Sequence, residues 1–184
     1  MWLALAVLLA SALAGVLVAG RADGAARSWR AYLAPVGACR DASDTAAAPA
    51  IQARAVECLL NWARARDRRG RLLERPALRR AATLKGREVA SCGQFSHTPC
   101  GVDLDASVRA SGYRYGALGE NLFAGTWGRV SPREVVAAWL RSPPHRANVL
   151  DRRFRHVGVA PVRAPRLLGD GDAVVWTATF AAPR

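Results

Sequence analysis

Three side chains in this sequence, two imidazoles and one carboxylate, have the chemistry of a metal or acid–base site. His97 lies in the turn-rich segment 94–101, Glu120 lies directly ahead of a strand-like run, and His145 follows a Ser-Pro-Pro turn. Two neutral ring nitrogens and one carboxylate oxygen are the ligand set of catalytic-type zinc sites, which keep a fourth position for water. If the three segments meet in space, the residues predict a divalent-cation site, with zinc as the preferred ion.

The segment that positions His145 is predicted to be an amphipathic helix followed by a turn and a new helical turn. The first helix begins at the capping box formed by Ser131 and Glu134. Its apolar face consists of Val135, Val136, Trp139 and Leu140. Prolines are tolerated in the first positions of the second helix, and Ser142 is expected to cap it. His145 is therefore expected on a stiff junction, with its ring directed into a cleft.

The motifs around these residues resemble those of the CAP superfamily, in its bacterial form. This is the family of cysteine-rich secretory, antigen 5 and pathogenesis-related 1 proteins. The similar stretches are Phe-Ser-His at His97, Gly-Glu-Asn at Glu120 and Trp-Leu-Arg-Ser-Pro-Pro-His-Arg-Ala-Asn-Val-Leu at His145. Flanking motifs follow in the expected order: Leu-Leu-Asn at residues 59–61 with Arg64 and Gly70, and Phe154 with Val-Gly-Val at 157–159. The similarity extends from about residue 50 to residue 180.

The resemblance implies an α+β fold, a three-layer α-β-α sandwich with a central antiparallel sheet. It also implies that His97, Glu120 and His145 converge as three members of a tetrad of two histidines and two glutamates. The fourth glutamate falls at or near Ser142 here, and this departure weakens both the zinc and the acid–base interpretation. Asn121 and Ser142 are expected to support the cleft.

Each candidate residue also has a structural interpretation. A turn histidine such as His97 or His145 often hydrogen-bonds backbone carbonyls, and Glu120 with Asn121 would also suit a buried hydrogen-bonding corner. Ser96 is poorly placed for activation by His97, because adjacent residues in an extended segment point to opposite sides. Structural roles are predicted for His156, Trp139 and Trp176. The carboxylates that could replace the missing tetrad member in space are Glu88 and Glu134.

Composition indicates one globular domain with a targeting segment. The chain has 184 residues, of which 51% are hydrophobic and 22% charged, and its formal net charge is +13. Lys85 is the sole lysine, so arginine supplies nearly all of the positive charge. The many arginines have two possible origins. They reflect either a compositional bias of the genome or a function in binding anionic lipid or cell-envelope polymer. No nucleic-acid-binding motif accompanies it, and no specific nucleic-acid partner is predicted.

The four cysteines allow three pairings, and none of them belongs to a CxxC pair, which argues against a zinc–thiolate site. A bridge between Cys92 and Cys100 would hold the His97 loop, and Cys39 would then tie the N-terminal extension to Cys58. Free buried thiols are the alternative. An even cysteine count agrees with an exported protein.

Residues 1–20 are uninterrupted apolar sequence and are predicted to be a signal peptide or an N-terminal membrane anchor. Residues 21–49 are predicted to be a linker or loose extension, and residues 50–184 the CAP domain. Helices are expected over 50–66, from 76 to between 88 and 92, over 105–111 and from 131. Strands are expected over 120–124, 156–162 and 173–180, the last two joined as a hairpin. Helices followed by paired strands indicate an antiparallel α+β architecture.

Three functions are compatible with these observations. The one we favour is a secreted or envelope-associated binding module, with a cleft for a divalent cation and a lipid, sterol or envelope partner. The second is a metal-assisted hydrolase of peptide or cell-wall bonds. The third is a structural wall-associated domain with an idle cleft. The incomplete tetrad and the lack of a clear general base argue against the hydrolase.

Overall fold

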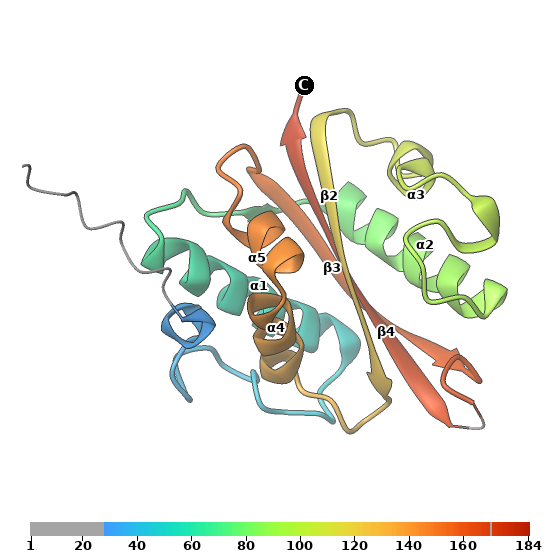
Figure 1. The fold of residues 1–184 in the computed structure, drawn as a ribbon, viewed down its shortest axis with the longest axis horizontal. Helices are drawn as coiled ribbons and strands as arrows, with labels where there is room; N and C mark the ends of the chain where they lie inside the picture. The colour runs from blue at the N-terminus through green and yellow to red at the C-terminus, as the bar shows by residue number, and fades with distance from the viewer. Residues whose placement is uncertain (1–27, 170) are drawn as a thin grey trace, which may run out of the picture.

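A four-stranded mixed sheet lies between two layers of helices in the computed structural model, which describes residues 28–169 and 171–184 (Figure 1). The strand order is β1-β3-β4-β2. β3 (His156–Pro165) and β2 (Tyr115–Thr126) both pair antiparallel with β4 (Asp172–Pro183). This confirms the expected α+β sandwich. The short β1 (Leu73–Glu74) adds one parallel pairing to the expected antiparallel sheet, because the connection between the first two helices follows the edge of β3 in the same direction.

The helices are divided between the two faces of the sheet. One layer contains α1 (Pro49–Arg66), α4 (Pro132–Arg141) and α5 (Pro143–Leu150) (Figure 1). The other layer contains α2 (Pro76–Cys92) and the short α3 (Ala106–Ala110). Single 3-10 turns lie at Trp29–Tyr32 and Pro99–Gly101. Among the described residues, no helix is long and apolar enough to cross a membrane. The predicted signal or anchor at residues 1–20 lies outside the described residues.

The core follows from the two-residue period of β4. Val174, Trp176 and Phe180 pack with the α1 and α4 layer, whereas Val175 and Ala181 pack on the α2 side. Both faces of β4 are therefore buried, which explains its almost continuous apolar sequence. On neighbouring β3, a Cβ at Gly158 would lie 2.0 Å from the backbone carbon of Leu78 in α2, so only glycine permits this close packing of helix and sheet.

The starts of α2 and α4 agree with the sequence prediction, whereas α1 begins at Pro49, the last residue of the predicted extension. α1, α2, α4 and α5 each have proline in the first turn, where a missing N–H costs nothing. The predicted capping box of α4 is present, because the Ser131 hydroxyl accepts from the Glu134 N–H while the Glu134 carboxylate accepts from the Ser131 N–H. Ser142 is the N-cap residue of α5, but its side chain makes no capping hydrogen bond, so that prediction is wrong. Pro143 and Pro144 provide no N–H groups at the first two positions of α5.

Residues 28–48, within the stretch predicted to be a linker or extension, pack against the domain. Tyr32, Ala34 and Ala42 are buried, and the Ala42 carbonyl accepts a hydrogen bond from the backbone N–H of Arg133. A disulfide joins Cys39 to Cys58 of α1. The segment therefore covers the α1 and α4 layer without forming regular structure beyond one 3-10 turn.

Arg64 holds α1 against the elements that lead into the sheet. Its guanidinium is fully buried and donates to the carbonyls of Gly70, Val149, Asp151 and Phe154 at 2.6 to 3.0 Å. Burial lowers the pKa of Arg64 to about 10, which still leaves it charged at neutral pH. Because Val149 lies in α5 and Asp151 directly follows it, this one side chain fixes the end of the helix that carries His145.

Candidate functional site

The edge strand β2 provides the link between the two predicted imidazoles. Successive residues of a strand point to opposite faces, so Glu120 lies on the α2 side and Asn121 on the α5 side. Glu120 contacts the ring of His97, and Asn121 contacts the backbone of His145. The three predicted site segments therefore meet at β2, with the helix layers on either side.

His97 and Glu120 form a hydrogen-bonded pair. The distance between His97 Nδ1 and Glu120 Oε1 is 2.8 Å, and the side chains are 46% and 3% exposed, respectively. A carboxylate accepts at this position, so Nδ1 of His97 carries the hydrogen. In the neutral imidazole, Nε2 is then the nitrogen with a free lone pair. The buried carboxylate thus fixes both the orientation and the tautomer of a half-exposed ring.

The loop that carries His97 is held from inside and across its base. Nζ of Lys85, a fully buried residue of α2, donates to the carbonyl oxygen of His97 at 3.0 Å. The same Nζ lies 3.1 Å from Glu88 Oε2, which makes an ion pair without the orientation of a hydrogen bond. The disulfide between Cys92 and Cys100 closes the loop. These contacts restrain the backbone on both sides of the imidazole.

His145 occupies the first turn of α5 and is half-buried. Burial, and then the neighbouring His97, lower the pKa of His145 below its ordinary value, so this imidazole is neutral at pH 7. Within residues 28–169 and 171–184, no hydrogen bond to its ring is found.

Amide side chains fix α5 to β2. Asn121, which is fully buried, donates to the carbonyl oxygen of His145 at 3.0 Å. Asn148 donates to the carbonyl oxygen of Glu120 at 3.1 Å and to Oδ1 of Asn121 at 2.9 Å. The expected supporting role of Asn121 thus has a physical basis. Ser142 supports α5 through its backbone, because its carbonyl accepts from the Arg146 N–H.

The two carboxylates considered for the missing tetrad position have other partners. Glu134 is occupied in the capping box of α4, where hydrogen bonds from Ser131 lower the pKa of its carboxyl. Glu88 is paired with Lys85. In the described part of the chain, no group of three or more His, Cys, Asp or Glu side chains is arranged to hold a metal ion. His97 lies close enough to His145 to lower its pKa, and Glu120 is the hydrogen-bond partner of the His97 ring.

The third histidine is bonded on both ring nitrogens. Tyr113 Oη lies 2.5 Å from Nδ1 of His156, and the Arg75 guanidinium lies 2.9 Å from Nε2. Because arginine only donates, Nε2 accepts and Nδ1 carries the hydrogen. Burial, followed by the positive charge of Arg75, lowers the pKa of His156. Both nitrogens are thus used within the fold. Ser96 likewise has a local role, since its hydroxyl accepts from the Thr98 N–H.

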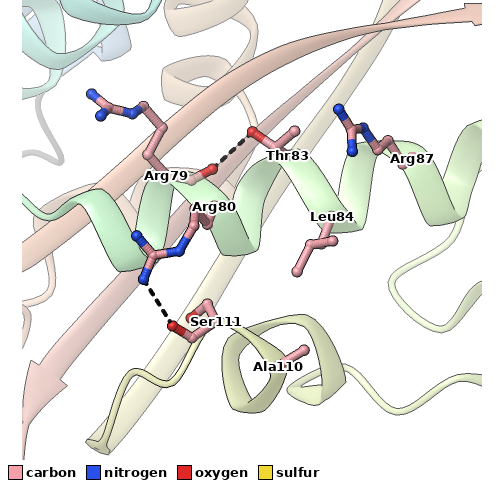
Figure 2. A pocket seen from close by; sticks show the side chains of 7 residues that line it. All are labelled: Arg79, Arg80, Thr83, Leu84, Arg87, Ala110 and Ser111. Carbon is pink, nitrogen blue, oxygen red and sulfur yellow. Dashed lines mark hydrogen bonds between the residues drawn. The ribbon is translucent and has the colours of Figure 1, made fainter.

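The largest of the cavities that we describe lies away from this site. Its volume is about 360 Å³, and residues of α2 and α3 line it (Figure 2). A second cavity of about 240 Å³ lies beside it, between α1, α2 and β3. Neither includes His97, Glu120 or His145 in its lining.

The order of elements, the mixed sheet between helix layers and the β2-centred pair of histidines define an α+β sandwich with a His/Glu site at a sheet edge. Residues 59–180 match the cysteine-rich secretory protein family, CAP, and the chain belongs to this family. The family resemblance stated from the motifs is therefore confirmed.

Among curated proteins, the uncharacterized protein YkwD of Bacillus subtilis is 30% identical over 104 residues, which is 56% of this chain. The chain spans about a third, 36%, of the length of that relative.

Solved structures share the fold. An extracellular protein containing an SCP domain from Bacillus anthracis has a TM-score of 0.62 at 20% identity, over 73% of this chain and 41% of the other. A cysteine-rich secretory protein from Staphylococcus aureus has a TM-score of 0.58 at 15% identity, over 74% and 40% of the two chains. An outer surface protein from Borrelia burgdorferi has a TM-score of 0.60 at 16% identity, over 70% of this chain and 90% of its own.

Two residues of the site were not identified from the sequence. Lys85 lies on the buried stripe of α2 that also contains Leu78, Ala82 and Val89. A lone lysine in such a stripe signals a buried partner, because charged side chains are almost never fully buried unless they are paired. Asn148 lies within the His145 motif, but nothing in its spacing indicates that it bonds to β2.

Proposed function

We propose that the protein is an exported binding module whose His97 and His145 imidazoles bind a divalent cation, with zinc preferred. One observation carries the proposal: the buried Glu120 carboxylate holds the Nδ1–H of His97, which leaves Nε2 with the lone pair on a half-exposed ring, and His97 is close enough to lower the pKa of the half-buried His145. A carboxylate that hydrogen-bonds the far nitrogen of a ligand histidine raises its basicity and fixes its direction.

The geometry does not fit the three-ligand zinc centre that the sequence suggested. Glu120 Oε1 is hydrogen-bonded to His97 Nδ1, and residue 142, where the tetrad would have its second glutamate, is a serine. The proposal is therefore a two-imidazole site in which a ligand or water completes the coordination. A hydroxyl group without a hydrogen bond lies next to Glu120. It belongs to Thr179, which is buried, pairs with Glu120 in the register of β2 and β4, and has no partner for its hydroxyl among the described residues. We propose no reaction at this site.

Export and an envelope partner belong to the same proposal. Two disulfides favour an oxidising compartment. Structural relatives include an extracellular protein and an outer surface protein, which supports the same location for this chain. A net charge of +13 favours an anionic partner, either envelope polymer or lipid headgroups.

Zinc titration by calorimetry tests the cation site. The purified, oxidised protein is expected to bind one equivalent, and His97→Ala and His145→Ala are each expected to abolish binding. His156→Gln is the matched control, since it removes an imidazole whose nitrogens are already occupied by Tyr113 and Arg75. Circular dichroism would establish that each variant is folded.

Glu120→Gln tests whether Glu120 contributes to zinc binding through its charge or only holds the His97 ring in place. The amide retains an acceptor for His97 but removes the charge that raises the basicity of the ring, so zinc affinity is expected to fall about 10-fold. Absence of zinc binding to the wild type, or binding by both histidine variants with the affinity of the wild type, would refute the cation site and leave the histidines as structural residues.

A further inference from the structure

A second site is indicated by the distribution of positive charge on the exposed face of α2. Arg80, Thr83, Leu84 and Arg87 lie at helical spacing and line the 360 Å³ cavity together with Arg79 and residues of α3. Figure 2 shows Arg79, Thr83 and Arg87 along one side of α2, and Arg80 and Leu84 on the side that faces α3. No acidic residue lines the cavity.

The three arginines differ in how they are held. Arg80 donates to the carbonyl oxygen of Ser111, which fixes its guanidinium against α3. Arg79 forms an ion pair with Glu74 at 3.1 Å, and its side chain remains 51% exposed. Arg87 is exposed, and no ion pair or hydrogen bond of its side chain is found among the residues described. Arg87 is thus the charge most available to a ligand, while Arg79 and Arg80 are pre-oriented.

The spread of these charges indicates the shape of the ligand. Arg80 and Arg87 are seven residues apart, which corresponds to about 10 Å along the helix. Their guanidinium groups do not converge on one point (Figure 2). A single small anion would contact one of them, whereas a chain with repeated anionic groups would contact all three. Guanidinium groups favour phosphate, which they bind through paired N–H donors.

We propose that the exposed face of α2 beside α3 binds a linear, phosphate-bearing polyanion through Arg79, Arg80 and Arg87. The inference rests on the proposed function in so far as it gives the anionic envelope partner a place on the molecule. The cation site lies elsewhere, so the two can fail independently. The cavity volume is within the range typical of ligand sites.

The test measures binding of linear inorganic polyphosphate to the full protein by calorimetry at two salt concentrations. Arg87→Gln is expected to weaken binding about 5-fold and to reduce the slope of log K against log salt by about 0.7. Arg129→Gln is the matched control, because Arg129 is also exposed, lies in the turn before α4 and changes the net charge equally. His97→Ala is expected to bind polyphosphate normally.

Three results would overturn the proposal. Equal weakening by Arg87→Gln and Arg129→Gln would show attraction to net charge alone. Failure of the wild type to bind polyphosphate would exclude this face of α2 as a polyanion site. Binding to phosphatidylglycerol vesicles that depends on Arg87, without polyphosphate binding, would assign the arginines to a membrane surface instead.

Discussion

A carboxyl group outside the histidine site offers a quantitative test of the structure. Glu57 of α1 is half-buried, and burial followed by the nearby carboxylate of Glu74 raises its pKa from 4.5 to about 7. Arg79 and Arg54 act in the opposite direction but do not compensate. The fold therefore places an acid where its ionised form is disfavoured.

The magnitude follows from linkage between protonation and folding. A rise from 4.5 to about 7 corresponds to about 3 to 4 kcal/mol, since one pKa unit is about 1.4 kcal/mol. Below pH 4.5 the group is protonated in both states and costs nothing. Between pH 4.5 and 7 only the folded state keeps the proton, so stability falls as pH rises through this window. Solvent access reduces the cost, and about 1 to 3 kcal/mol is expected above pH 7.

Glu57→Gln removes this titration. Urea unfolding at pH 4.5, 6 and 8 is expected to show a variant close to the wild type at pH 4.5 and more stable by about 1 to 3 kcal/mol at pH 8. Asp103→Asn is the control: it makes the same change of net charge at a side chain that is 76% exposed, and less than about 0.5 kcal/mol is expected at each pH. A Glu57→Gln effect that is constant with pH, or of opposite sign at pH 8, would refute the reasoning.

Further predictions concern the buried groups that position the site. Arg64→Lys cannot satisfy the four carbonyls that Arg64 bonds and is expected to cost at least about 4 kcal/mol in urea unfolding; a loss below about 1 kcal/mol would contradict this. Lys85→Met is expected to speed amide hydrogen exchange at residues 94–98, because the His97 carbonyl loses its donor; unchanged exchange would contradict it. The lowered pKa values of His145 and His156 mean that stability is complete above about pH 6.5 and falls as pH decreases, and His156→Gln is expected to flatten the dependence of the melting temperature on pH.

The sequence predicted those helices and strands that are specified by a short local pattern, such as a capping motif or an alternation of apolar residues. The capping box of α4, the start of α2 at residue 76 and the hairpin of β3 and β4 are all present. The start of β2 was not predicted: the strand extends from Tyr115, although the expected strand began at Glu120. Gly116 and Gly119 give the first part of β2 little strand propensity, and pairing with β4 determines its conformation.

The site could be predicted only in part, for a physical reason. No periodicity relates His97 to Glu120 or His145, so the motifs named the residues but not their contacts. The positions are set by buried side chains that bond backbone carbonyls: Lys85 bonds His97, and Asn121 bonds His145. A bond to a carbonyl leaves no signal in the residue that accepts it, because every residue type carries the same acceptor.

Because these hydrogen bonds go to backbone carbonyls, the backbone conformation of the site does not depend on the histidine side chains. Lys85 and Asn121 hold the backbone of His97 and His145 irrespective of which side chain projects from it, whereas Glu120 hydrogen-bonds the ring of His97 itself. Replacing a histidine is therefore expected to change ligand binding while the frame remains folded. A serine at position 142 can likewise be accommodated, because the frame makes no use of its side chain to start α5. Loss of zinc binding in a folded His145 variant would thus report on the imidazole alone.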